Sequence, residues 1–280
     1  MGILKHVLRS IYRSSPKSWV AYLKTKESPE ARLSLAEVSR LKSMPRFQPA
    51  LVPYQGKKLQ IVDSASFLFM FQELLGEEIY RFTSGNRTPY ILDCGANIGL
   101  SILYFKRLFP EAVIVGFEPD PKIFAALKAN VDGFGLRGVE LVPKAVWSSE
   151  TTLSFSHEGA DGGHIAGPSE RKGIIEIKTV RLRDYLDKPV DLLKMDIEGA
   201  ECEVLRDCRE ALKRVERLFV EFHSFAGKGQ ELQSLLTYLN EAGFRYNIQS
   251  TGVLSKHPFV ARQVHAGMDM QLNIFAYRAD

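Results

Sequence analysis

Short apolar segments alternate with longer amphipathic segments along the chain from Pro89 onward. The apolar segments carry hydrophobic residues on both faces, as strands of a parallel sheet do. In the amphipathic segments, hydrophobic residues recur at the spacing of an α-helix. This alternation predicts an α/β fold with a doubly wound, Rossmann-like, mostly parallel sheet that has helices on both faces. The expected strands are 90–93, 112–118, 139–146, 191–196 and 217–223, and the expected helices are 98–109, 121–131, about 200–206 and 229–243.

Two further apolar segments, 244–249 and 271–278, lie near the end of the sequence without a convincing long helix between them. Strands that are joined without a helical crossover usually pair in antiparallel fashion. We therefore expect these two segments to close one edge of the sheet as a hairpin-like pair, which brings the sheet to seven strands.

The first 88 residues follow a different pattern. They begin with two helical stretches and a proline-rich segment, followed by a short strand at 58–63 and an apolar helix at 66–82. The expected division is an N-terminal helical extension over 1–50 and a single main domain over 51–280, made of a lead-in at 51–88 and a core at 89–280.

Positive charge is concentrated at the start of the sequence. The net charge is +4, but residues 1–26 carry six basic residues and no acidic one. The remaining residues are close to neutral, which argues against a nucleic-acid partner, because a phosphate-binding surface needs clustered cations. The three cysteines, an odd number without zinc-binding spacing, argue against a secreted disulfide scaffold and favour a cytoplasmic protein.

Residues 1–26 also alternate apolar and basic side chains at helical spacing. Three interpretations are open: a helix that packs on the body or on a second subunit of a homo-oligomer, a helix that lies on a membrane surface, and a mitochondrial-type presequence. Its apolar runs are shorter than the ~18–20 residues that a membrane span needs. Membrane association, if it occurs, is therefore expected to be peripheral.

The stretch "ILDCGANIGL" joins the first core strand to its helix with small residues and few bulky side chains. Gly95 permits a tight turn and Gly99 lets the helix start close to the strand, so we expect a ligand to lie against this turn. Backbone N–H groups at the start of the helix would face that ligand. The spacing G-x-x-x-G differs from the G-x-G-x-x-G turn of dinucleotide enzymes. The candidate binding residues in the turn are Asp93, Gly95, Ala96, Asn97 and Gly99.

The second core strand ends in Glu118, Pro119 and Asp120. Glu118 stands where an acidic residue of a nucleoside-binding sheet accepts hydrogen bonds from the ribose hydroxyls. A glycine turn without a diphosphate fingerprint, followed by a ribose-binding acid, fits S-adenosylmethionine, a nucleoside without phosphate. The alternative is a sheet that binds no nucleotide, in which these groups are only turn residues.

Five segments of the sequence resemble the FkbM-type methyltransferases of the class I S-adenosylmethionine-dependent fold: "ILDCGANIGLS", "VIVGFEPDPKIFAALKANV", "LVPKAVWS", "TVRLRDYL" and "VDLLKMDIEGAECEVL". The resemblance covers about residues 61–277. It implies methyl transfer, usually to a hydroxyl of a sugar, polyketide or other small molecule. It also implies that Lys144, Ala145 and Val146 lie near the adenine ring.

A second group of polar residues follows the fourth and fifth core strands. Asp196 and Glu198 follow one strand, Glu221 and His223 share a face of the next, and neighbouring strand ends should bring them together beside the cofactor. A base is needed to remove the proton of an acceptor hydroxyl, and we expect Glu198 to serve first, His223 second, with Asp196 as an orienting group. Alternatively, Glu198 and Glu201 only stabilise a helix N-terminus, and His223 is a structural residue. These groups would also suit a divalent metal, although their spacing does not require one and none is predicted.

The glycine-rich segment 159–167 connects two strand-like segments, 151–156 and 173–180. Glycine gives such a loop mobility, so it is a candidate cover for the acceptor side, with His164 in reach of the substrate. The alternative is a simple connection between strands.

Two rival functions remain at this stage. An NAD-dependent oxidoreductase would share the sheet but needs the G-x-G-x-x-G turn, which the segment 93–99 lacks. A non-catalytic interaction module on the same fold is favoured only by the amphipathic segment 1–26.

Overall fold

The computed structural model of the 280-residue chain describes residues 33–157, 163–165, 173–251, 257–261, 263–264 and 267–279. The basic segment 1–26, with its three interpretations, lies outside these residues. None of the helices in the described ranges is long and apolar enough to cross a membrane.

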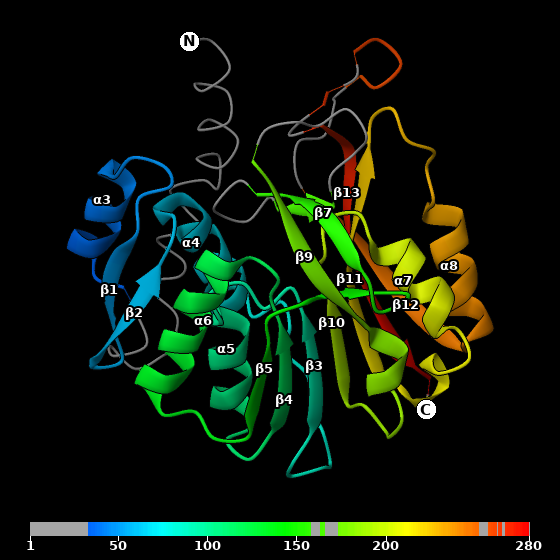
Figure 1. The fold of residues 1–280 in the computed structure, drawn as a ribbon, viewed down its shortest axis with the longest axis horizontal. Helices are drawn as coiled ribbons and strands as arrows, with labels where there is room; N and C mark the ends of the chain where they lie inside the picture. The colour runs from blue at the N-terminus through cyan, green and yellow to red at the C-terminus, as the bar shows by residue number, and fades with distance from the viewer. Residues whose placement is uncertain are drawn as a thin grey trace.

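A seven-stranded sheet forms the centre of the molecule, with the strand order β12-β13-β11-β10-β3-β4-β5 (Figure 1). β13 pairs antiparallel with both of its neighbours, whereas the other pairs are parallel. The predicted doubly wound sheet with an antiparallel edge pair is therefore confirmed. The strands are β3 (Tyr90–Cys94), β4 (Val113–Phe117), β5 (Val139–Val142), β10 (Leu192–Met195), β11 (Arg217–Phe225), β12 (Phe244–Thr251) and β13 (Met268–Arg278).

Helices cover both faces of this sheet (Figure 1). Successive residues of β3 point to opposite faces. Ile91 packs into the core under the helices α5 and α6, whereas Leu92 packs into the core under α7 and α8. The helices are α5 (Leu100–Leu108), α6 (Pro121–Phe134), α7 (Glu201–Cys208) and α8 (Leu232–Glu241).

The chain leaves β3 and its neighbour β10 toward opposite faces of the sheet, into α5 and α7 respectively. The strand order therefore reverses between these two strands. In doubly wound sheets the crevice beyond the carboxyl ends of strands at such a point is the usual ligand site.

The segment before β3 packs onto the same core as α5 and α6. It contains α3 (Leu35–Ser43), the hairpin of β1 (Ala50–Tyr54) and β2 (Lys57–Ile61), and α4 (Ser64–Phe71), which continues as the π-helical turn η2 (Gln72–Gly76).

Two details of this segment differ from the predictions. β1 was not predicted, because Pro53 argues against a strand interior; here Pro53 lies in a two-stranded edge hairpin, where a missing N–H is tolerated. The predicted helix 66–82 ends at Gly76, after its π-helical turn. The division of the chain at residue 50 stays a prediction.

A smaller four-stranded sheet, ordered β6-β9-β7-β8, lies beside the central one. The single strand predicted over 139–146 is wrong: Lys144 N–H bonds to Val142 O at 2.9 Å in a tight turn at Pro143, and the chain changes sheet there. The strands are β6 (Ala145–Trp147), β7 (Thr152–Ser156), β8 (His164–Ile165) and β9 (Ile174–Arg181).

Candidate active site

A cavity of about 180 Å³ opens beyond the carboxyl ends of β3, β4, β10 and β11. Its walls bring together segments that lie far apart in the sequence, from η2 to β13. Most of the predicted cofactor residues line it: Gly95, Ala96, Asn97, Glu118, Pro119, Asp120, Lys144, Ala145 and Val146. The predicted catalytic residues Asp196 and Glu198 line the same cavity.

The two glycines of the turn between β3 and α5 are required by close contacts with other parts of the protein. Gly95 has φ +83°, and a Cβ atom there would lie 2.0 Å from the backbone oxygen of Asp196. Gly99 has φ +86°, and a Cβ atom there would lie 2.7 Å from a methyl group of Leu127. Gly99 therefore brings the helix close to its neighbour, as predicted, but the space that both glycines leave is taken by protein atoms. The expectation that a ligand fills it is wrong for these two positions.

The Glu118 carboxylate lies at the end of β4 and is only 6% exposed. One oxygen accepts the N–H of Asn97 at 3.1 Å, and the other accepts the N–H of Asp120 at 2.9 Å. Burial, together with the charge of Asp120, raises the pKa of Glu118 to about 7 despite these hydrogen bonds. The carboxylate is thus oriented by the backbone and placed in the wall of the cavity.

Asp120 has a structural task besides lining the cavity. Its carboxylate caps α6 by accepting the N–H groups of Lys122 at 2.8 Å and Ile123 at 3.2 Å. It also forms a short ion pair with His157 from the end of β7. Asp120 therefore fixes the start of α6 against the smaller sheet, beside Glu118.

Asp93 is fully buried behind the cavity and does not line it. It accepts a hydrogen bond from Ser101 Oγ at 2.5 Å, and its other oxygen lies 3.4 Å from Lys194 Nζ. Lys194 in turn donates to Gly95 O at 2.6 Å and lies 3.5 Å from Asp196. Burial lowers the pKa of Lys194, but Asp196 and Asp93 raise it by more, so the ammonium ion is held charged. Asp93 acts on the cavity through Lys194 and the turn.

Four carboxylates converge on the other end of the cavity, from η2, the turns after β10 and the strand β11: Glu73, Asp196, Glu198 and Glu221. Burial, together with the neighbouring carboxylates, raises the pKa of Glu73 to about 9 and that of Glu221 to about 7. Burial also raises the pKa of Glu198 well above its ordinary value. Glu198 has a left-handed backbone, φ +56°, which is unusual for a residue with a side chain. Strain of this kind often accompanies a functional position.

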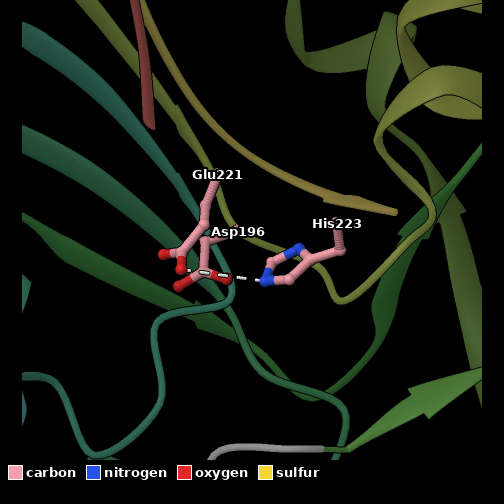
Figure 2. Close-up of side chains that lie close together, drawn as sticks. All are labelled: Asp196, Glu221 and His223. Atoms are coloured by element: carbon pink, nitrogen blue, oxygen red, sulfur yellow. Dashed lines mark ion pairs between the residues drawn. The ribbon is translucent and has the colours of Figure 1, made fainter. Parts of the chain in front are cut away.

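His223 lies behind these carboxylates rather than in the cavity wall, with a side chain that is 1% exposed. Its Nδ1 lies 3.0 Å from the buried carboxylate of Glu201, and its Nε2 lies 3.6 Å from Glu198. The same Nε2 lies 3.7 Å from Glu221 (Figure 2). Burial lowers the pKa of His223, but the carboxylates of Glu198 and Glu201 raise it by more. The predicted meeting of Asp196, Glu198, Glu221 and His223 is therefore found, although β11 continues to Phe225, so that Glu221 and His223 lie within this strand and not at its end.

The comparison with known proteins agrees with this geometry. Residues 93–246, more than half of the chain, match the family model of the methyltransferase FkbM domain. The chain belongs to the FkbM methyltransferase family. Membership implies S-adenosylmethionine as the methyl donor, and the resemblance noted from the sequence is confirmed.

Relatives of this FkbM methyltransferase include the methyltransferase sdnD of Sordaria araneosa, 28% identical over 67% of this chain and 87% of the relative. The 2-O-methyltransferase NoeI of Sinorhizobium fredii is 28% identical over 48% of this chain and 63% of its own length. The 31-O-demethyl-FK506 methyltransferase FkbM of Streptomyces tacrolimicus is 26% identical over 65% of this chain and 84% of its own length.

Several lining residues of the FkbM methyltransferase were missed by the sequence analysis. Phe69, Met70, Glu73, Leu74 and Tyr80 come from the lead-in segment, which carried no functional signal because its apolar residues read as an ordinary core helix. Lys194 and Gln271 also line the cavity. Only Lys194 had a signal, as a charged residue inside the otherwise apolar strand "LLKM".

The glycine-rich segment 159–167 was predicted to cover the acceptor side of the site, and one of its described residues borders the cavity. Gly163 and Phe155 line the cavity, so the described part of this region borders the site. The ring of His164 instead packs against Phe225, with ring centres 5.8 Å apart. Residues 158–162 and 166–172 lie outside the described residues, and a role of His164 toward the substrate stays a prediction.

Proposed function

We propose that this FkbM methyltransferase transfers the methyl group of S-adenosylmethionine to a hydroxyl oxygen of a small polar acceptor, such as a sugar. The observation that carries the proposal is one cavity with two chemically different ends. One end has the buried acceptor pair of Glu118, and the other has the carboxylates Asp196, Glu198 and Glu221.

The first end fits a nucleoside. The Glu118 carboxylate has further lone pairs besides those used by the backbone N–H groups, and two ribose hydroxyls are suitable donors for them. Lys144, Ala145 and Val146 line the cavity next to it, as the family resemblance implies for the adenine ring. The bound cofactor supplies an electrophilic methyl group on a positively charged sulfur, and acidic residues in the cavity wall favour that charge.

The second end fits a hydroxyl acceptor. Its proton must be taken up during transfer, and a carboxylate within hydrogen-bond reach does this efficiently when its pKa is raised toward the working pH. Burial raises the pKa of Glu198 above its ordinary value, and the side chain is 20% exposed. His223 is less suitable as a base because its side chain is 1% exposed and enclosed by carboxylates. Asp196 holds Lys194 and the turn around Gly95 in place.

The proposed acceptor class rests on the lining and on the relatives. Aromatic and carboxylate side chains occur together in the cavity wall, where Phe69 and Tyr80 line the same cavity as Glu221. This mixture suits molecules with hydroxyl groups and apolar ring faces. The relatives include a 2-O-methyltransferase and a hexuronic acid methyltransferase, whose names describe transfer to sugars or to oxygen.

The experiment is methylation of a panel of sugars and hydroxylated small molecules with radiolabelled S-adenosylmethionine. We expect label on at least one hydroxylated acceptor, and we expect Glu198→Gln to lower single-turnover transfer by about 10²–10⁴-fold while S-adenosylhomocysteine affinity stays within about 2-fold. Glu203→Gln, at an acid of α7 that pairs with Arg206 on the surface, is the matched control and should transfer normally.

Two outcomes would contradict the proposal. Cofactor binding without transfer to any member of a broad panel would favour a non-catalytic module. Thermal stabilisation by NAD rather than by S-adenosylhomocysteine would favour an oxidoreductase. Unchanged transfer in Glu198→Gln would remove only the assignment of the base.

A further inference from the structure

We propose that Asp196, Glu221 and His223 form a binding site for one divalent cation at the acceptor end of the cavity. One ligand atom from each of the three side chains can be chosen so that all three lie within 4.8 Å of one another. Figure 2 shows both carboxylates turned toward the same edge of the His223 ring. The catalytic use of the cation rests on the proposed function, but the binding site does not.

The fold places the three groups without help from flexible segments. Asp196 follows the last residue of β10, and Glu221 and His223 lie two apart on β11, which pairs with β10 in parallel register. Side chains two apart on a strand point to the same face. Paired strands of the central sheet therefore hold the three ligand atoms within 4.8 Å of one another.

The orientation of His223 is an independent sign of a metal ligand. Glu201, which is 1% exposed, lies 3.0 Å from Nδ1 and also accepts the N–H of Gly199 at 3.0 Å. The Glu201 carboxylate is placed to accept a hydrogen bond from Nδ1–H, so Nε2 is the nitrogen that faces the other carboxylates, and a cation bound there would replace the proton that those carboxylates favour. A carboxylate behind the histidine is the usual support of a metal-binding imidazole.

The Nε2 atom of His223 faces two carboxylates from a distance, although the side chain is 1% exposed. Its neighbours among the described residues are the amide of Gln271, in a long hydrogen-bond contact at 3.4 Å, and the carboxylates of Glu198 at 3.6 Å and Glu221 at 3.7 Å. Both carboxylate distances exceed those of a normal hydrogen bond. A buried nitrogen that faces two carboxylates at such distances leaves room for an ion between them.

The charge of the cavity wall also favours a bound cation. The described part of the cavity wall carries six acidic residues and two lysines, so a cation is electrostatically favoured. The side chains of Asp196 and Glu221 are 28% and 18% exposed, which leaves coordination positions open toward the cavity. Two carboxylates and one imidazole form a mixed oxygen and nitrogen donor set, which suits Mn²⁺ better than Mg²⁺.

A cation held by Asp196, Glu221 and His223 would act as a Lewis acid and would lower the pKa of an acceptor hydroxyl beside it. In the transfer step, the hydroxyl oxygen of the acceptor is the nucleophile. The oxygen forms a bond to the methyl carbon as the bond between methyl and sulfur breaks. The electron pair of that bond stays on the sulfur of S-adenosylhomocysteine, and the hydroxyl proton passes to the Glu198 carboxylate. The metal oxidation state does not change.

The test is titration of the full chain with MnCl₂, followed by electron paramagnetic resonance, which distinguishes free from bound Mn²⁺. Thermal stabilisation by S-adenosylhomocysteine is measured on the same samples. Glu221→Gln and His223→Gln each remove one ligand. Glu216→Gln is the matched control, because this acid lies next to the other end of β11 and its side chain is 51% exposed.

We expect one bound Mn²⁺ per chain, with echo modulation from one imidazole nitrogen that is absent in His223→Gln. Both ligand variants should bind Mn²⁺ at least about 10-fold more weakly, whereas Glu216→Gln should bind it normally. Stabilisation by S-adenosylhomocysteine without saturable Mn²⁺ binding, or equal Mn²⁺ affinity in Glu221→Gln, overturns the metal site and leaves the proposed function intact. Mn²⁺ binding without stabilisation by S-adenosylhomocysteine contradicts the proposed function and leaves the metal site standing.

Discussion

Replacement of Glu118 by alanine should weaken cofactor binding more than any other single change at the nucleoside end of the cavity. The carboxylate oxygens are fixed by the N–H groups of Asn97 and Asp120, at 3.1 and 2.9 Å, and remain available to two ribose hydroxyls. Each hydrogen bond to a charged acceptor contributes about 1.5 kcal/mol or more. Loss of two such bonds therefore costs about 3 kcal/mol, which corresponds to an affinity about 100-fold lower.

The assay is isothermal titration of S-adenosylhomocysteine into the wild type, Glu118→Ala and Glu140→Gln. Glu140 is an exposed acid on the neighbouring strand β5 and serves as the matched control. We expect a decrease in affinity only for Glu118→Ala. An affinity within 3-fold of the wild type would refute the assignment of Glu118 to the ribose.

The same residue gives a prediction for pH. The pKa of Glu118 is raised to about 7 in the free protein, so the folded state binds this proton more tightly than the unfolded chain does. Its contribution to stability is present at low pH and is lost as the pH rises through about 7. Because the ionised form accepts more hydrogen bonds, stabilisation by S-adenosylhomocysteine should grow between about pH 6 and pH 8. A pH-independent thermal shift would contradict this, and Glu118→Gln should show a weaker dependence on pH than the wild type, with Glu221 still titrating near pH 7 in the same cavity.

Two further predictions concern stability. Gly95→Ala should lower the free energy of unfolding by about 3 kcal/mol or more, because its Cβ would lie 2.0 Å from the backbone oxygen of Asp196 and because φ is +83°; chemical denaturation measures this. Arg46→Ala should lower it by about 3 kcal/mol, because the Asp63 carboxylate, whose side chain is fully buried, would lose its paired guanidinium at 2.9 Å; thermal denaturation measures this.

Matched variants separate these effects from the general effect of a substitution. Gly133→Ala, where an added Cβ meets no atom within 4 Å in α6, should stabilise the protein by up to about 1 kcal/mol. Arg209→Ala, at an ion pair with Glu241 whose side chains are 46% and 49% exposed, should change stability by less than about 0.5 kcal/mol. Equal effects of Gly95→Ala and Gly133→Ala, or of Arg46→Ala and Arg209→Ala, would contradict the packing argument.

The features that could be predicted from the sequence are those that the local pattern of residues determines. The parallel strands of the central sheet are mostly apolar runs, so the fold could be predicted from periodicity, and Glu118 could be placed because it follows one of these runs. Glu221 and His223 could be placed on one face because the period of a strand is two.

Other features depend on contacts between distant segments. Glu73 lies about 120 residues before Asp196 in the sequence, and only the packing of α4 and η2 beside α5 brings it to the cavity. The break between β5 and β6 depends on pairing with β9, which no local pattern reveals. For Gly95, the sequence indicated a close approach but could not tell a ligand from the backbone of Asp196.

A crystal structure of the chain with S-adenosylhomocysteine is the most direct test of the account. It should show the nucleoside in the cavity beyond β3 and β4, with both ribose hydroxyls on the Glu118 carboxylate and the sulfur directed toward Asp196 and Glu198. A ligand bound elsewhere on the protein, or a Glu118 carboxylate that contacts only its own backbone while the ligand is bound, would contradict it.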